Sequence, residues 1–207
     1  MLITTKNKAQ TMRQENDKPY RGEMQGGAGL GEVCAVSACA DQDIVASKWI
    51  ALEGTARLAA QHKERLRERF PVRMIDEAVA FEKYLSVIPE AATATKSGVC
   101  GIRSLSQSGI FTGLWEMAQE AGVGLEVDLR KIPVRQETIE ICEFFGENPY
   151  ELASGGCLLM TAGSGTILAA ALMREGIPAT VIGRTTQGKQ RVVYNQGRKR
   201  FLDKPRY

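Results

Sequence analysis

The most regular pattern of apolar and polar positions lies between residues 109 and 132. Its first apolar residues recur at helical spacing and would form one broad helix face: Ile110, Phe111, Leu114, Trp115, Met117, Ala118 and Ala121. Gly122 follows directly, where helices commonly end on a left-handed residue. From Val123 the period changes to two, which is typical of a strand with one buried face. The pattern predicts a helix that leads into a strand, with Leu114, Trp115, Phe111 and Val127 buried together.

The same periodicities predict the other elements. Strands are expected where short apolar runs are bounded by turn residues: 43–50, 98–102, 157–161, 179–183, 191–194 and 200–202. Helices are expected where apolar residues recur every three to four positions: 55–70, 74–85, 89–95, 138–145 and 167–175. Gln196 and Gly197 mark a closing hairpin. Short helices that alternate with strands indicate an α+β fold, with a sheet whose helices pack mainly on one face.

Composition divides the chain into three segments. Residues 1–42 are polar and of mixed charge, and their glycine cluster at 26–31 fits no phosphate-loop pattern, so we expect a flexible segment there. Residues 43–97 are expected to form a strand and a helical linker, and residues 98–207 the main domain. The first residues do not form a signal-peptide pattern, and no apolar run is long enough to span a bilayer. We therefore expect a cytoplasmic protein without a membrane partner.

Charge and cysteine content disfavour several kinds of site. The net charge of +3 is too small to indicate nucleic-acid binding, and the basic cluster at 184–206 is better interpreted as a solvated surface. Five cysteines without a Cys-x-x-Cys pair suggest no disulfide framework. With a single histidine, His62, a zinc site is disfavoured as well, and we predict no metal-binding residues.

Six further segments taken together carry a family resemblance: 49–55, 85–90, 109–118, 131–138, 179–184 and 200–203. On these segments the chain, from about Asp43 to its end, resembles the carboxy-terminal part of AIR synthase-related, or PurM-like, proteins. It is most similar to the branch of the hydrogenase-maturation dehydratase. The resemblance implies a PurM-like C-terminal domain with a mixed or antiparallel sheet, preceded by a helical linker. It also implies an ATP-dependent family.

The loop before the helix at 110–121 departs from the family pattern. The family usually has a His-Asp-x-Thr-x-Gly-Gly-like motif, whereas residues 103–109 read Arg-Ser-Leu-Ser-Gln-Ser-Gly. Ser104 stands at the aspartate position, so no carboxylate remains there to hold Mg²⁺. The resemblance leaves candidates for binding an anion or phosphate at the helix N-terminus: Arg103, Ser104, Ser106, Gln107, Ser108 and Gly109. The alternative is a degenerate loop that only caps the helix, and no catalytic residue is predicted.

Two further departures concern the ends of the chain. Family members carry a large amino-terminal domain that supplies much of the nucleotide site and the dimer interface, and residues 1–42 lack its acidic metal-binding pattern. The hydrogenase-maturation dehydratase acts through a cysteine at its carboxy terminus, where residues 204–207 read Lys-Pro-Arg-Tyr. Both departures argue against independent catalysis by this chain.

We therefore favour a C-terminal module that requires no cofactor and acts as a homo-oligomer or with a separate nucleotide-binding subunit. One alternative is an enzyme with residual ATP or phosphate binding that completes its site across an oligomer interface. A less favoured alternative is a basic protein that binds nucleic acid through residues 184–206. Whether the chain is an enzyme stays open at this stage.

Overall fold

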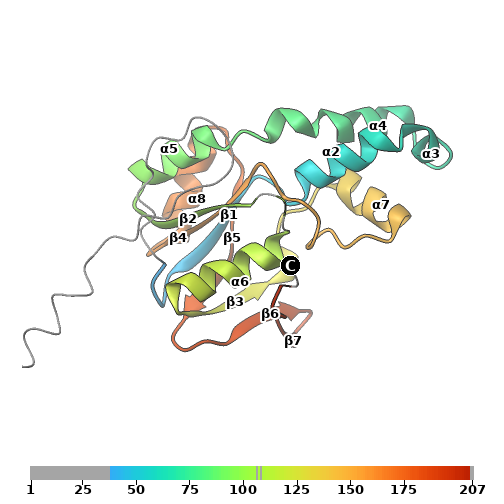
Figure 1. Cartoon of the computed structure of the whole chain (residues 1–207). Helices are drawn as coiled ribbons and strands as arrows, with labels where there is room; N and C mark the ends of the chain where they lie inside the picture. The colour runs from blue at the N-terminus through green and yellow to red at the C-terminus, as the bar shows by residue number, and fades with distance from the viewer. Residues whose placement is uncertain (1–37, 106, 108, 206–207) are drawn as a thin grey trace, which may run out of the picture.

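A mixed sheet forms the centre of the molecule. The computed structural model describes residues 38–105, 107 and 109–205. Within them the strands form a seven-stranded sheet in the order β2-β4-β1-β5-β3-β6-β7 (Figure 1). The strands are β1 (Asp43–Ser47), β2 (Val99–Leu105), β3 (Gly124–Asp128), β4 (Cys157–Ala162), β5 (Ala179–Thr186), β6 (Arg191–Asn195) and β7 (Arg198–Phe201). Adjacent strands run antiparallel, except for the parallel pair β3 and β6. The α+β class and the mixed sheet predicted from the sequence are confirmed.

Helices lie on both faces of the sheet and beyond one end of it (Figure 1). They are α2 (Leu52–Gln61), α3 (Lys63–Arg67), α4 (Val72–Val79), α5 (Ile88–Lys96), α6 (Ile110–Ala121), α7 (Gln136–Phe145) and α8 (Gly165–Arg174), with 3₁₀ turns η1 (Ala80–Tyr84) and η2 (Leu129–Lys131). α6 packs on one face, whereas α5 and α8 pack on the other. The helices thus cover both faces of the sheet, whereas the sequence pattern predicted them mainly on one, and the edge strand β7 stays exposed.

The alternation of side chains along β1 connects the two cores. Ile44 and Ala46 belong to the apolar cluster under α6, whereas Val45 belongs to the cluster under α5 and α8. All three side chains are completely buried. A strand whose two faces are both covered is expected to be apolar throughout, because successive side chains point to opposite faces.

The segment 43–97, predicted as a strand and a helical linker, contributes directly to the sheet. β1 lies between β4 and β5 and pairs with both strands. Residues just before it are also tied to β5, since the amide of Asp41 donates to the carbonyl of Thr185. The expected flexible segment falls mostly on residues 1–37, which lie outside the described residues. Strand order, which depends on distant pairings, could not be inferred from local periodicity.

Four helices and one 3₁₀ turn form what we call the helical extension, made of α2, α3, α4, η1 and α7. It projects beyond the end of the sheet (Figure 1). Its separate apolar cluster includes Leu66, Ile75 and Ile141, all of them buried. Pro71 precedes α4 in extended conformation, which separates α3 from α4 as the sequence predicts. The extension therefore has its own small core, and its connections lead back to the sheet.

One core prediction is wrong in part. Leu114 and Val127 are completely buried in the same cluster, and Phe111 packs against it while half-buried. Trp115 lies outside this cluster, under the guanidinium of Arg191, whose carbon is 4.5 Å from the indole ring centroid. The apolar face of α6 is wider than the stripe that meets the sheet, so its edge residue is covered by a surface side chain instead.

The buried thiols of Cys142 and Cys157 allow this packing to be tested by chemical labelling. Burial raises the pKa of Cys157 in β4 to about 12 and that of Cys142 in α7 to about 11, above the usual value of about 8.5. Because only the thiolate reacts, we expect iodoacetamide at neutral pH to modify exposed Cys39 while sparing Cys142 and Cys157 until the chain unfolds. Peptide mass spectrometry after timed labelling measures this difference.

The raised pKa values of these two thiols predict that the folded chain loses stability at high pH. Both folded-state pKa values lie above those of the unfolded chain, so the folded state keeps protons that the unfolded state loses. The free energy of unfolding should therefore fall between about pH 9 and pH 12. Labelling of Cys157 in the native state as fast as Cys39 would contradict its burial in β4.

Candidate functional site

The predicted anion-binding residues lie where β2 ends and α6 begins. Arg103 and Ser104 belong to β2, Gln107 is exposed in the connection, and buried Gly109 is the N-cap of α6. Ser106 and Ser108 lie outside the described residues. Adjacent residues of a strand point to opposite faces, so Arg103 and Ser104 do not converge on one ligand from this strand. Anion binding at this loop stays a prediction.

The charge of Arg103 is already matched. Its guanidinium donates to the carboxylate of Glu116 at 3.0 Å and also pairs with Glu120. The two acids are four residues apart on α6, so their carboxylates lie on the same side of the helix. Arg103 and Glu116 are each about one quarter exposed. Two carboxylates around one guanidinium leave a net negative charge, which disfavours an anion at this position.

The start of α6 is covered by a turn at residues 148–152. The amide of Phe111 donates to the carbonyl of Tyr150 at 3.2 Å, and the two rings stack with centroids 5.1 Å apart. A methyl group on Gly109 would overlap with the Tyr150 carbonyl and lie 2.5 Å from Glu151 Cα. Gly109 is therefore required for close approach of this turn, which explains its presence without any phosphate.

A second helix start resembles an anion site in sequence but is occupied by the protein itself. Residues 163–166, Gly-Ser-Gly-Thr, lead into α8. The Gly165 amide donates to a carboxylate oxygen of Asp43 at 2.8 Å. A carboxylate at this position stabilises the positive end of the helix and repels another anion. The α8 N-terminus is thus capped by β1.

A buried ion pair joins the sheet to the connection before α5. Nζ of Lys48 lies 2.5 Å from Oε1 of Glu90 and donates to the carbonyls of Tyr84 at 2.6 Å and Ser86 at 2.7 Å. The two side chains are only 8% and 3% exposed. These three acceptors satisfy the three N–H donors of an ammonium group. Lys48 is therefore a charged structural residue, and its contacts do not suit a nucleophile.

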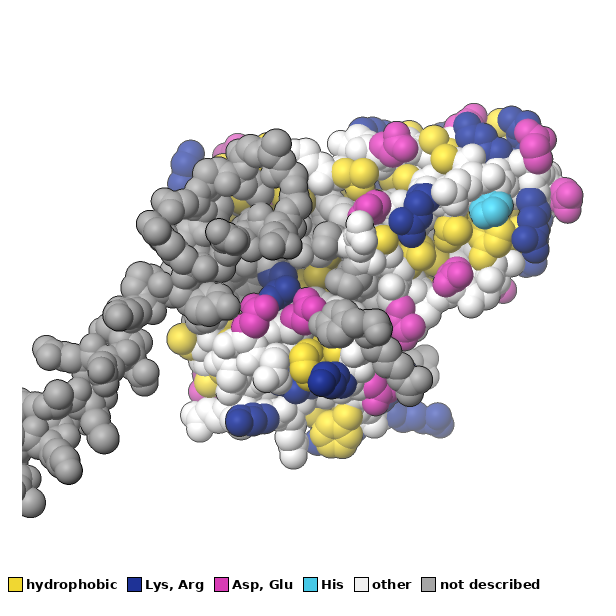
Figure 2. Space-filling view, in the orientation of Figure 1, with side chains coloured by type: hydrophobic (Ala, Val, Ile, Leu, Met, Phe, Trp, Pro, Cys, Tyr) yellow, Lys and Arg dark blue, Asp and Glu magenta, His cyan; other side chains and the backbone are white. Residues whose placement is uncertain are grey.

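The described residues do not contain a cluster of three or more His, Cys, Asp or Glu side chains that could hold a metal ion. On the face shown in Figure 2, basic and acidic side chains are interspersed over the helical extension and do not form a single basic patch. In the part of the chain that the structure describes, no helix is long and apolar enough to cross a membrane. A cytoplasmic location stays a prediction.

The family described as AIR synthase related protein, C-terminal domain, matches residues 41–195. The chain belongs to this family. Carbamoyl dehydratase HypE of Rhodobacter capsulatus is 37% identical over 95 residues, which cover 44% of this chain and 28% of HypE. The PurL subunit of phosphoribosylformylglycinamidine synthase from Symbiobacterium thermophilum is 33% identical over 88 residues, 42% of this chain and 11% of PurL.

Solved structures show the same fold. HypE from E. coli aligns with a TM-score of 0.66 and 21% identity, over 83% of this chain and 52% of that protein. Thiamine monophosphate kinase from Aquifex aeolicus aligns with a TM-score of 0.54 and 20% identity, over 81% and 53%. The chain thus spans about half the length of these structures. The PurM-like C-terminal fold predicted from the resemblance is confirmed, and the chain is similar to HypE, as that resemblance implies.

Proposed function

We propose that the chain is a C-terminal module of HypE-like type that does not catalyse alone and acts with a nucleotide-binding half or with a second copy. One observation carries this proposal: the match is to the C-terminal domain family and spans about half of the solved HypE structures. One of those structures is HypE in complex with ATP, and another is a HypE–HypF complex. A module of this family is therefore expected to work inside a larger assembly.

The chemistry of the described residues supports the absence of independent catalysis. Phosphoryl transfer from ATP ordinarily needs Mg²⁺ held by carboxylates. Within the described residues no acidic cluster of that kind is found. The guanidinium of Arg103 already forms ion pairs with Glu116 and Glu120. At the start of α6, the amide of Phe111 already donates a hydrogen bond to the carbonyl of Tyr150.

An apolar surface on α8 supports association. Ile167 is 67% exposed and lies with Ala170 and Ala171 in a groove of about 360 Å³, which Thr166 and Arg174 of α8 and Ser97 after α5 also line. The three apolar α8 residues share one side of the helix because they are three and four positions apart. Exposed large apolar residues of this kind are common at protein interfaces. The groove is our candidate surface for the second copy or the nucleotide-binding half.

We expect weak, metal-independent anion binding and no ATP hydrolysis by the isolated chain. The measurement is an ATP titration with and without Mg²⁺, combined with an assay of released phosphate. Arg103→Ala serves as the variant, because the residual-enzyme alternative needs this cation at the phosphate. Tight Mg²⁺-dependent binding with turnover that Arg103→Ala abolishes would overturn the proposal and favour the enzyme.

Association is tested by a pair of variants on the same helix. Ile167→Glu places a charge in the α8 groove, whereas Met173→Glu changes an equally exposed residue on another side of α8. Sedimentation at tens of micromolar should show an oligomer for the natural chain and for Met173→Glu, and a smaller species for Ile167→Glu. A monomer in all three cases would contradict self-association and leave pairing with a separate half, which mixing with that half then tests.

The N-terminus of α6 keeps the residual phosphate-binding alternative open. It lies beside exposed Gln107 and begins a twelve-residue helix, whose N-terminal end carries partial positive charge. If a second copy completed a site here, turnover would rise with the square of protein concentration before saturating. Absence of turnover at concentrations where the chain is an oligomer would exclude this alternative.

A further inference from the structure

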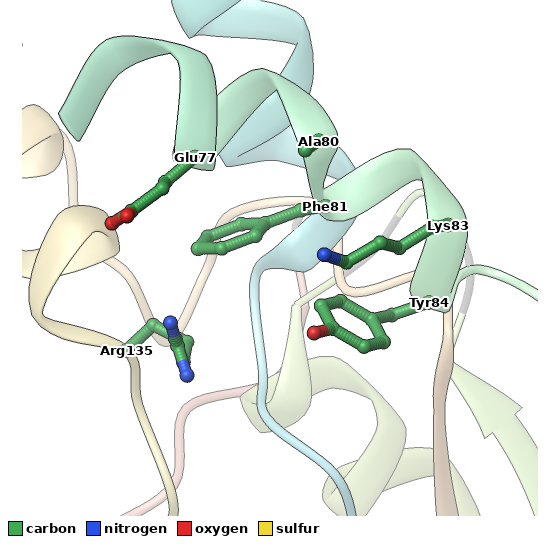
Figure 3. A pocket seen from close by; sticks show the side chains of 6 residues that line it. All are labelled: Glu77, Ala80, Phe81, Lys83, Tyr84 and Arg135. Carbon is green, nitrogen blue, oxygen red and sulfur yellow. The ribbon is translucent and has the colours of Figure 1, made fainter. Parts of the chain in front are cut away.

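A hollow on the helical extension combines cationic and aromatic side chains. It lies between η1 and the start of α7, has a volume of about 240 Å³, and is lined by Glu77, Ala80, Phe81, Lys83, Tyr84 and Arg135 (Figure 3). In the close-up, Arg135 approaches from the α7 side and Lys83 from η1, with the Phe81 ring between them. The two cations therefore face the same space from opposite walls.

Arg135 is held in place before any ligand arrives. Its Nε and Nη2 donate to the two carboxylate oxygens of Glu137 at 3.2 and 3.0 Å. Its guanidinium carbon lies 5.0 Å from the ring centroid of Trp49 and 5.5 Å from that of Phe81. A guanidinium has five N–H donors, so others remain for a ligand. Because the group is already ordered, binding loses little side-chain entropy.

The aromatic wall of the hollow is equally fixed. Phe81 is only 1% exposed, and Tyr84 packs edge-on against Trp49 with centroids 5.6 Å apart. Nζ of exposed Lys83 lies 4.9 Å above the Tyr84 ring. These contacts hold the two rings of η1 together and place an ammonium group at the mouth of the hollow. Because Phe81 is buried, a flat apolar ligand group can pack only against the accessible part of the Tyr84 ring.

The local charges leave one cation in excess. Arg135 is paired with Glu137, and Glu77 is paired with Arg73 at 2.9 Å. Among the described residues no ion pair is found for Lys83. A single excess positive charge suits a monoanion better than a phosphate dianion. The planar fork of a guanidinium also matches a planar carboxylate.

The size of the hollow restricts its ligand further. Sites for drug-sized ligands begin at about 300 Å³, and this hollow is smaller. A nucleoside triphosphate is too large to fit inside it. We propose that it binds a small, single-ring aromatic carboxylate, with the carboxylate between Arg135 and Lys83 and the ring against Tyr84. This inference does not depend on the proposed function.

The test uses the full chain labelled with ¹⁵N and benzoate as the probe. Titration should shift the amide signals of residues around the hollow, including Phe81, Lys83 and Arg135, along one saturating curve. Benzamide has the same shape without the charge, and it should bind about tenfold more weakly, the size expected for a lost charge-assisted hydrogen bond. Equal binding of benzamide and benzoate would overturn the role of the cations.

Three variants complete the test. Arg135→Gln should weaken benzoate binding about tenfold and Lys83→Gln severalfold. Arg130→Gln removes an exposed arginine that pairs with Asp128 outside the hollow, and it should leave the affinity unchanged. If Arg135→Gln fails to fold, exposed Lys83→Gln and the benzamide comparison still decide. Shifts scattered over the surface, or unchanged affinity in Lys83→Gln, would overturn the proposal.

Discussion

Replacing Lys48 by methionine is expected to lower the free energy of unfolding by about 3 to 5 kcal/mol, the range found when one partner of a buried ion pair is removed. The substitution leaves the carboxylate of Glu90 buried and without its cation. It also removes the donor of the Tyr84 and Ser86 carbonyls. Methionine is unbranched and similar in length, so the loss measures charge and hydrogen bonding more than packing. Urea unfolding followed by circular dichroism gives the difference.

Two controls separate the ion pair from general effects of substitution. Oε2 of Glu90 is buried without a hydrogen-bond partner among the described residues, so the pair is incompletely satisfied. The double variant Lys48→Met/Glu90→Leu should therefore recover most of the lost stability. Arg73→Met breaks an exposed pair with Glu77 and should change stability by less than about 1 kcal/mol. A loss below about 1 kcal/mol for Lys48→Met would contradict a stabilising role of this buried pair.

The helix and strand at 109–132 could be predicted because their determinants are local. The helix runs from Ile110 to Ala121 and ends at Gly122 in the left-handed conformation, and β3 follows from Gly124. Apolar spacing and one glycine contain this information. The position of β1 in the middle of the sheet depends instead on pairing with β4 and β5, more than a hundred residues away. No local pattern encodes such a partner.

In the candidate site, too, local features could be predicted from the sequence, whereas contacts between distant residues could not. The resemblance located the loop at 103–109 and its missing aspartate, and Gly109 does begin α6. The pairing of Arg103 with Glu116 and Glu120 was missed, although the four-residue spacing of these acids was visible in the sequence. That spacing shows that both acids lie on one side of α6, but only the folded structure shows that β2 contacts this side. The turn at Tyr150 that covers the helix start is likewise a non-local contact.

The other large effect is expected at Gly183, where β5 passes β3. A methyl group there would overlap with the carbonyl oxygen of Glu126 and lie 2.8 Å from Val127 Cα, and both are backbone atoms of the neighbouring strand. They cannot move away without lengthening the hydrogen bonds between β3 and β5, which join the β3, β6 and β7 side of the sheet to the rest. Overpacking typically costs about 1 to 3 kcal/mol, and we expect Gly183→Ala to cost about 3 kcal/mol or more because the clash is with backbone.

A loss of that size corresponds to a fall in Tm of about 6 to 12 °C for a chain of this length, which differential scanning calorimetry measures. Gly163→Ala is the matched control, because a methyl group at Gly163 meets nothing within 4 Å. It should change Tm by no more than about 2 °C, the effect of an ordinary surface substitution. Hydrogen exchange adds a spatial readout, since the amides of β3 and β6 should lose protection in Gly183→Ala before those of β4. Equal Tm values for the two variants would mean that β3 and β5 lie farther apart than this register allows.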